Sequence, residues 1–347
     1  MKLLTKEKNA YFAASNTSMG FVSYFDRIFG ELDTLYIIKG GSGTGKSKLM
    51  REVAFAAEKK GLEVEYFYCS LDPSSLDGII IPSMSLGFVD GTFPHVVEPT
   101  YPGAVEHTID LSQFWNPDLL KKRRKDIVAI SAEKKRIFAI AMDYLAIAGS
   151  LENQIHQIAA PAVDFGKLRT LAEQLTSSLL TGNGHHEIIR NFQGIGAGGQ
   201  VELDISKGHN EIFVIEPFCG AEYVLLDNIR RIGMEKGHKV TVSFCPLLPT
   251  KANVVCLDGI AFVISDNIHG REVDVKSAVT TGIFDNQKAT IDRLGEYKNS
   301  MLNHAVEGFQ LAMDVHFALE EIYIDAMDFT RKEEFTRLLV EELFRKD

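Results

Sequence analysis

The stretch "LYIIKGGSGTGKSKLM", residues 35–50, places a glycine-rich loop between an apolar run and an amphipathic segment. The run 35–38 is apolar throughout, which is typical of a parallel strand buried on both faces. Beyond the loop, apolar residues recur at helical spacing: Leu49, Met50, Val53, Ala54 and Ala57. The order of strand, loop and helix predicts an α/β fold organised around an anion-binding loop.

The loop fits the pattern GxxxxGK[ST], called Walker A, over residues 40–47. Its glycines permit the tight turn that directs backbone N–H groups at phosphate oxygens. Lys46 would reach the β- and γ-phosphates, and the Ser47 hydroxyl would take a Mg²⁺ coordination position. The alternative is a chance match, which a chain of this length shows about once in a hundred. We expect ATP, or alternatively GTP, to bind with Mg²⁺ at Gly40, Gly41, Ser42, Gly43, Thr44, Gly45, Lys46 and Ser47.

A second candidate for the same site is Asp90, which ends the apolar run "LGFV" at 86–89. This is the expected place for a Walker B carboxylate that holds Mg²⁺ through water. We therefore expect Lys46 and Asp90 to be catalytic, and Ser47 and Asp90 to hold the metal. An alternative stays open: if "GIIIP" at 78–82 forms a hairpin with 86–89, Asp90 would sit on a sheet edge and outside the Walker B position.

The chain also repeats itself. Segment 59–73 aligns with 235–249, 86–95 aligns with 260–269, and 164–180 aligns with 328–344. Three blocks in the same order predict two related halves. We place the P-loop domain at 1–182 and its relative at 183–347, joined at "TGNGHH", because Gly and Asn favour turns.

The second half has lost the chemistry of the first loop. Its sequence at the end of the corresponding loop is "AEY", residues 221–223. Glu222 stands in place of the phosphate-binding lysine, Tyr223 replaces the small hydroxyl, and Pro217 removes a backbone donor. Ile264 stands in place of Asp90. We therefore expect 183–347 to be a degenerate P-loop-like domain that lacks Walker A and does not bind nucleotide in the usual way.

Other polar residues have weaker support. Asp72 and Asp77 follow a second expected strand, at 63–69, after which phosphotransferases commonly keep a substrate-facing carboxylate. A turn rich in Asp, Pro and Ser explains them equally well. His95 recurs as His269 in the half without the loop, which favours a structural or inter-domain role.

An arginine from the second half would supply charge to the transition state if the protein uses an arginine finger. The candidates are Arg230, Arg231 and Arg271, and the sequence offers no means of choosing among them.

Composition limits the partners. The 347 residues carry a net charge of −10, which argues against nucleic-acid binding. The basic run at 121–125 is interpreted as a solvated helix surface. No apolar run approaches the ~18 residues of a membrane span. Four cysteines without a CxxC pair, and no signal-peptide pattern, lead us to expect a cytoplasmic protein. A protein partner or a homo-oligomer stays open.

The phrases "GGSGTGKS", "YCSLDPSSLDGIIIP" and "FVDGTFPH", followed by helical segments and a second similar unit, resemble an uncharacterised bacterial family of tandem P-loop ATPase or nucleotide-kinase-like proteins. The resemblance covers nearly the full chain and implies ATP binding with Mg²⁺. The expected fold is α/β, with two tandem P-loop NTPase-like units. Each would be a three-layer αβα unit with a mainly parallel sheet and a long helical excursion, and the second unit would be degenerate.

Three functions follow as expectations. The first is a Mg²⁺-dependent NTPase with one active site in the N-terminal half and a regulatory pseudo-NTPase in the C-terminal half. The second is a small-molecule or nucleotide kinase, in which Asp72 or Asp77 orients an acceptor hydroxyl. The third is a nucleotide-sensing interaction module with little turnover.

Overall fold

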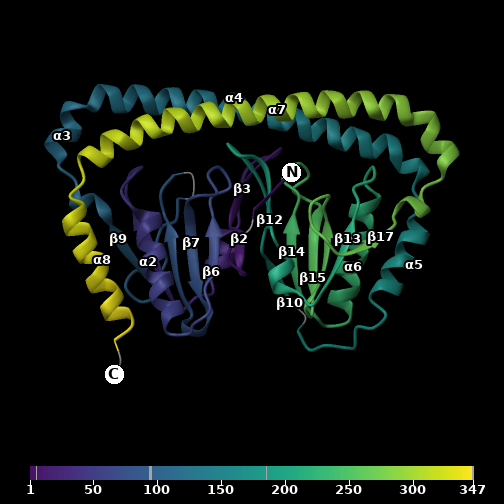
Figure 1. The fold of residues 1–347 in the computed structure, drawn as a ribbon, viewed down its shortest axis with the longest axis horizontal. Helices are drawn as coiled ribbons and strands as arrows, with labels where there is room; N and C mark the ends of the chain where they lie inside the picture. The colour runs from purple at the N-terminus through teal and green to yellow at the C-terminus, as the bar shows by residue number, and fades with distance from the viewer. Residues whose placement is uncertain (5, 94–95, 185, 346–347) are drawn as a thin grey trace. The chain divides into compact units, whose positions relative to one another are not determined.

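A computed structural model of the chain describes residues 1–4, 6–93, 96–184 and 186–345. It is a mixed α/β structure with mostly parallel sheets (Figure 1). Contacts between Cα atoms divide the chain into two compact units. Unit 1 comprises Met1–Lys8, Ser15–Val22 and Ala141–Glu307, and unit 2 comprises Asn9–Ala14, Ser23–Ile140 and Gly308–Asp347.

The core of unit 2 is a six-stranded sheet. Its order is β2 (Ala10–Phe12), β6 (Glu65–Tyr68), β7 (Leu76–Ile81), β8 (Leu86–Asp90), β5 (Thr34–Lys39) and β9 (Glu106–Asp110). Strand β7 runs antiparallel to both of its neighbours, and the remaining pairs are parallel. Every residue of β7 is buried, as expected of a central strand covered on both faces.

Unit 1 contains a six-stranded sheet with the same sequence of parallel and antiparallel pairings. Its order is β10 (His186–Ile189), β14 (Lys239–Phe244), β15 (Ala252–Leu257), β16 (Ile260–Ile264), β13 (Glu211–Ile215) and β17 (Arg271–Val273). A smaller sheet in unit 1 joins β1 (Lys2–Leu4), β12 (Gly199–Leu203) and β11 (Gln193–Gly196). Strands β3 (Ala14–Thr17) and β4 (Gly20–Ser23) form a two-stranded sheet.

Helices cover these sheets. They are α1 (Phe25–Phe29), α2 (Lys46–Lys59), α3 (Pro117–Lys122), α4 (Arg124–Ala159), α5 (Phe165–Leu175), α6 (Ala221–Glu235), α7 (Thr281–Asp325) and α8 (Phe329–Leu343). The expected apolar stripe of α2 is confirmed, because the five predicted residues are all buried.

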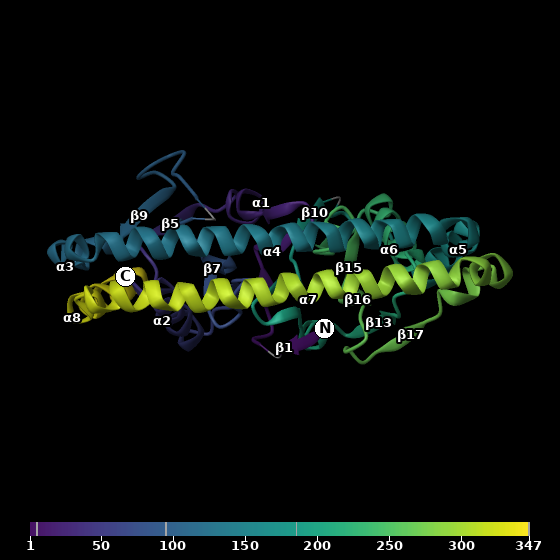
Figure 2. The ribbon, with the colours of Figure 1, turned by 90° about the horizontal axis from the view of Figure 1, so that it is seen from above.

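The long helices α4 and α7 each contribute residues to both units. Within unit 2 they meet through the rings of Phe138 and Phe309, whose centroids are 5.4 Å apart. Within unit 1 they meet through Tyr144 and His304, at 5.2 Å. The two helices lie side by side in each unit (Figure 2).

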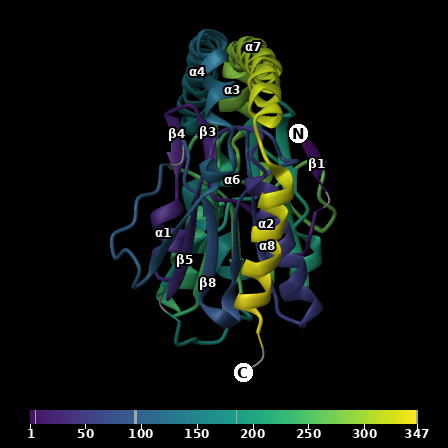
Figure 3. The ribbon, with the colours of Figure 1, turned by 90° about the vertical axis from the view of Figure 1, so that its left-hand side faces the viewer.

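The compact units do not follow the expected boundary between 1–182 and 183–347. Helix α5, from the first half, packs against α6 in unit 1, where Leu168 and Ala172 are fully buried. Helix α8, from the second half, packs against α2 in unit 2 (Figure 3). The physical reason is that α4 and α7 are long enough to carry the helix that follows each of them into the other unit.

The suspected hairpin between 78–82 and 86–89 is present as β7 and β8. It does not place Asp90 on an edge, because β8 pairs on its other side with β5, where Asp90 lies opposite Ile38. His95 lies outside the residues that the structure describes.

Candidate functional site

The glycine-rich loop connects the end of β5 to the start of α2 in unit 2. Gly43 and Gly45 have φ angles of 70° and 82°, which is the left-handed region that side chains disfavour. Gly45 occupies the N-cap of α2, so the helix has no side-chain cap there. The first N–H groups of the helix therefore remain available to an anion.

Lys46 folds back over this loop. Its Nζ donates to the carbonyl oxygens of Gly40, at 3.0 Å, and Gly41, at 2.8 Å. The same atom lies 3.5 Å from Asp90 Oδ2. Both side chains are mostly buried, with 12% and 16% exposed. The structure thus brings together the two residues that we expected to be catalytic.

Local hydrogen bonds orient Asp90 and Ser47. Asp90 Oδ1 accepts from the backbone N–H of Thr92, at 2.9 Å, and from the Thr92 hydroxyl. Its other oxygen is left to face Lys46. The Ser47 hydroxyl oxygen accepts from the N–H of Leu76, at 3.0 Å, which ties the start of α2 to β7.

A cavity of about 490 Å³ opens over the loop and lies within unit 2. All eight residues of 40–47 line it, together with Asp72, Asp77 and Asp90. Asp72 Oδ1 accepts hydrogen bonds from the backbone N–H and the hydroxyl of Ser74, so part of the "DPSSLDG" segment is the turn that we considered. Asp77 is buried beside this turn, with 5% of its surface exposed.

Sequence reasoning missed several cavity residues, among them Lys134 on α4, and His316 and Glu320 on α7. Lys134 Nζ lies 2.7 Å from His316 Nδ1. Because an ammonium only donates, Nδ1 must accept, and the ring proton is left on Nε2, which lies 3.4 Å from Glu320 Oε1. No local motif marks these residues, since each lies on a long helix far along the chain from the loop.

The electrostatics of this cluster follow from its position. Burial lowers the pKa of Lys134, and the positive charge of Lys46 lowers it further. The hydrogen bond to His316 is the main cause of the lowered pKa of Glu320, to which the charge of Lys46 also contributes. Lys134 thus places a second amino group at the cavity of Lys46, where burial favours the neutral form of that group.

The three arginines proposed as fingers belong to unit 1 and have partners there. Arg230 holds Glu187 with two hydrogen bonds, at 2.6 and 2.9 Å. Arg231 donates to Asn228 within its own helix. Arg271 lies 3.9 Å from Glu211. The arginine finger stays a prediction, without a preferred candidate.

The corresponding loop of unit 1 holds its own anion. Glu222 Oε2 accepts hydrogen bonds from the backbone N–H groups of Phe218, at 2.9 Å, and Gly220, at 3.0 Å. Glu222 is 2% exposed, and burial raises its pKa despite these two bonds. A side-chain carboxylate therefore takes the N–H groups that a phosphate would need.

Within the described ranges, no helix combines the length and apolar character needed to cross a membrane. In the same residues, no group of three or more His, Cys, Asp or Glu side chains is placed to hold a metal ion by itself. Comparison of the chain with protein-family models, curated proteins and solved structures finds no match.

Proposed function

We propose that unit 2 binds a nucleoside triphosphate together with Mg²⁺ and hydrolyses it. The observation that carries this proposal is the position of Lys46. Its ammonium group contacts both the loop carbonyls and Asp90, close to the N-terminus of α2. A triphosphate entering the loop would exchange these internal contacts for charged phosphate oxygens. Charge-assisted hydrogen bonds of this kind are stronger than those between neutral groups.

The residues present fit Mg²⁺. Mg²⁺ in nucleotide sites is bound by one or two protein oxygens, with phosphates and water completing its shell. Ser47 would contribute a hydroxyl oxygen, and Asp90, already held by Thr92, would contribute a carboxylate through water. The ion would neutralise charge on the phosphates. Such a site needs no cluster of three or more protein ligands, and the described residues contain none.

Lys134 is our candidate for the additional positive charge that phosphoryl transfer requires. It lies on α4, lines the cavity that the loop lines, and feels the charge of Lys46. His316 holds its Nζ by accepting a hydrogen bond. We therefore place the charge within unit 2.

Isothermal titration with ATP, GTP and ADP in Mg²⁺ tests the site. We expect Lys46→Ala to weaken ATP binding by about ten-fold or more, because a charged contact to phosphate is lost. Lys48→Ala is the matched control: it removes a lysine two residues further along α2, 58% exposed and paired with Glu333. Equal affinity in the wild type and Lys46→Ala would overturn the proposal, and the ranking of nucleotides would identify the base.

A kinase is the second candidate, favoured by one observation. The cavity extends from the loop to Asp72 and Asp77, so an acceptor molecule would lie beside two carboxylates. Phosphate release without any added acceptor supports hydrolysis, whereas ADP formation that depends on an added alcohol or nucleotide supports the kinase.

We further infer that unit 1 is a degenerate relative of unit 2. The shared strand order, the shared antiparallel strand and the loop that precedes α6 all support this inference. Glu222 would then stand at the sequence position of the phosphate-binding lysine, and its carboxylate would take the hydrogen bonds that a phosphate takes in an intact loop. A role for unit 1 other than nucleotide binding follows.

A further inference from the structure

The cavity over the glycine-rich loop of unit 2 has aromatic side chains as well as charged ones in its lining. Phe93, on the segment between β8 and β9, and Phe317, on α7, both line it. Phe93 is 83% exposed and Phe317 is 48% exposed. Single exposed apolar side chains are common on protein surfaces, but apolar groups gathered at a cavity with polar groups are typical of ligand sites. Both rings are therefore accessible to a molecule in this cavity.

Hydrogen bonds hold the segment that carries Phe93. Lys39, the last residue of β5, donates from Nζ to the carbonyl oxygens of Gly91, at 2.9 Å, and Val97, at 2.7 Å. The residue that precedes Phe93 donates to Asp90 from its backbone N–H and from its hydroxyl. The chain is thus fixed on both sides of Phe93, next to the proposed metal site.

Helix α7 contacts the loop on either side of Phe317. His316 Nδ1 lies 3.4 Å from the hydroxyl oxygen of Ser42. One turn further along the helix, the Glu320 carbonyl oxygen would lie 3.1 Å from a Cβ atom placed on Gly43. These close contacts fix the position of Phe317 relative to the loop.

Unit 1 provides an internal comparison for both rings. The alignment of 86–95 with 260–269 pairs Phe93 with Asn267. The 164-residue shift that aligns 164–180 with 328–344 extends back without a gap and pairs Phe317 with Asn153. Both aromatic residues are therefore asparagines in the unit whose loop N–H groups are taken by Glu222.

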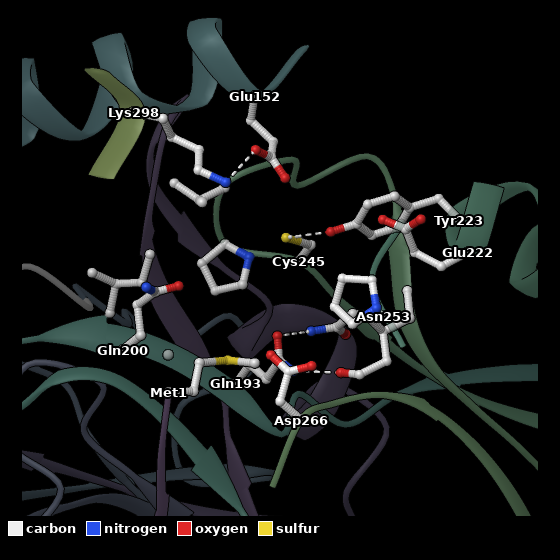
Figure 4. A pocket seen from close by; sticks show the side chains of 16 residues that line it. Met1, Glu152, Gln193, Gln200, Glu222, Tyr223, Cys245, Asn253, Asp266 and Lys298 are labelled. Atoms are coloured by element: carbon white, nitrogen blue, oxygen red, sulfur yellow. Dashed lines mark hydrogen bonds and ion pairs between the residues drawn. The ribbon is translucent and has the colours of Figure 1, made fainter. Parts of the chain in front are cut away.

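The structure supports this alignment of the long helices. The same shift pairs Lys134 with Lys298, and His316 with Glu152. In unit 2, Lys134 Nζ lies 2.7 Å from His316 Nδ1. In unit 1, Lys298 Nζ lies 2.7 Å from Glu152 Oε2 (Figure 4). The two contacts occupy corresponding positions, so the residues that follow His316 and Glu152 correspond as well.

The cavity beside the loop of unit 1 differs in the same sense. Its volume is about 240 Å³, against about 490 Å³ in unit 2. Tyr223 contributes a ring to its lining, but this residue is only 9% exposed, and its hydroxyl donates to Cys245 Sγ at 3.3 Å (Figure 4). Exposed rings at the cavity thus accompany the intact Walker A motif.

We propose that Phe93 and Phe317 bind a planar aromatic ring of a ligand in the cavity of unit 2. The inference rests on the proposed function, because it requires phosphates at the loop of the same cavity. Such a site fits a nucleoside, since every base has a π-face that can stack on an aromatic side chain. The ring belongs either to the nucleoside triphosphate itself or to a nucleoside that accepts its phosphate, and the chemistry of recognition is the same in both cases.

Isothermal titration of the full chain in Mg²⁺, with ATP and with inorganic tripolyphosphate, tests the proposal. Tripolyphosphate carries the phosphate chain without the ring. Phe93→Leu and Phe317→Leu keep an apolar side chain but remove the ring. If the ring is the base of ATP, each variant should bind ATP about ten-fold more weakly and tripolyphosphate normally. Normal tripolyphosphate binding also establishes that the variants are folded.

A second titration distinguishes the acceptor. Adenosine, guanosine, cytidine and thymidine are titrated into protein saturated with tripolyphosphate and Mg²⁺. If the ring belongs to an acceptor, ATP affinity should be unchanged in the two variants, and at least one nucleoside should bind the wild type and bind each variant about ten-fold more weakly.

The matched control is Phe55→Leu, which removes an exposed ring of unit 2 on α2, outside the cavity, and should change neither titration. Wild-type affinity of both cavity variants for ATP and for every nucleoside would overturn the inference. The proposed function would still stand in that case if Lys46→Ala weakened binding of both ATP and tripolyphosphate. A wild type that bound neither of these two ligands would overturn the function and the inference together.

Discussion

At the scale of single residues, the two loops differ most in how they use a buried charge. In unit 2 the ammonium group of Lys46 donates to two loop carbonyl oxygens, and under our proposal it would turn from them to a phosphate. In unit 1 the carboxylate of Glu222 is bound to loop N–H groups, which leaves no opening for an anion. The two loops thus hold opposite charges at corresponding positions, which supports our proposal that only the loop of unit 2 binds a nucleotide.

Glu222 should make the stability of unit 1 depend on pH. Burial raises its folded-state pKa above the ordinary value of 4.5, so the folded state holds a proton that the unfolded state releases. Stability from this group is fully present below 4.5 and is lost as pH rises through the raised pKa. Glu222→Gln lacks this proton, so the difference in free energy of unfolding between variant and wild type should grow in favour of the variant across that window.

Urea denaturation at a series of pH values measures this difference, and Asp266→Asn, which removes an exposed carboxylate of the same unit, serves as the control. A parallel pH dependence of Glu222→Gln and the wild type would contradict the prediction.

The residues of the loop could be predicted from the sequence because their chemistry is local. A phosphate loop needs its glycines, lysine and hydroxyl at fixed spacing, so the motif carries the site. Lys134 and His316 could not be predicted in this way. They reach the cavity only because two long helices pass over it in unit 2, and nothing in their neighbouring residues records that placement.

At the scale of elements, the start of α2 depends on a backbone conformation that only glycine adopts without strain. Gly45, with φ of 82°, ends the loop at the N-cap. A Cβ placed there would come no closer than 3.5 Å to Lys332, which is ordinary contact. The effect of Gly45→Ala would therefore come from the backbone and not from crowding.

We expect Gly45→Ala to destabilise unit 2 by about 1 kcal/mol and to weaken ATP binding, because the loop N–H groups shift as the strain is relieved. Gly61→Ala is a close control: Gly61 follows the other end of α2, with φ of 76° and no atom within 4 Å of its Cβ position. It should lose similar stability and bind ATP normally. Equal ATP affinity in the two variants, measured by titration, would show that the loop tolerates the change.

Strand β7 illustrates what the sequence leaves undetermined at this scale. Its run "GIII" at 78–81 has no alternation of apolar and polar residues, because both faces are buried. Such a run indicates a strand but carries no information about its direction. The antiparallel placement of β7 between β6 and β8 depends on the short connections on either side of it, and the sequence left the hairpin as only one of two options.

At the scale of the whole molecule, the units are interleaved along the chain. The internal repeat predicts the number and order of the elements, but not which sheet the last helix of each half joins. Helices α5 and α8 both begin with Asp-Phe, and in each the aspartate caps the helix by accepting a backbone N–H. Because their local sequences are alike, these sequences do not indicate which sheet each helix joins. The long helix that precedes each of them determines it.

This exchange predicts how the halves behave when separated. Fragment 1–182 contains the sheet of unit 2 but lacks α8, and fragment 183–347 contains the larger sheet of unit 1 but lacks α5. Each fragment would expose a helix face that is buried in the full chain. We expect that neither fragment melts cooperatively and that fragment 1–182 does not bind ATP. A mixture of the two fragments should recover both properties.

The control is the full chain carrying a protease site between residues 182 and 183, cleaved after folding. It should keep its melting transition and its ATP affinity, because the cut removes no contact. A cooperative transition and full ATP affinity in fragment 1–182 alone would show that α8 is dispensable.

Interleaving also determines the order in which the parts of each unit are synthesised. The sheet of unit 2 emerges early, yet the wall of its cavity that carries His316 and Glu320 is translated only after all of unit 1. At ordinary elongation rates the interval from Ile140 to Gly308 lasts on the order of 10 to 30 s. During that delay the apolar surface that α8 covers in the full chain is exposed, so we expect a chaperone to bind the nascent polypeptide there. The proposed nucleotide pocket should form only after unit 1 is complete.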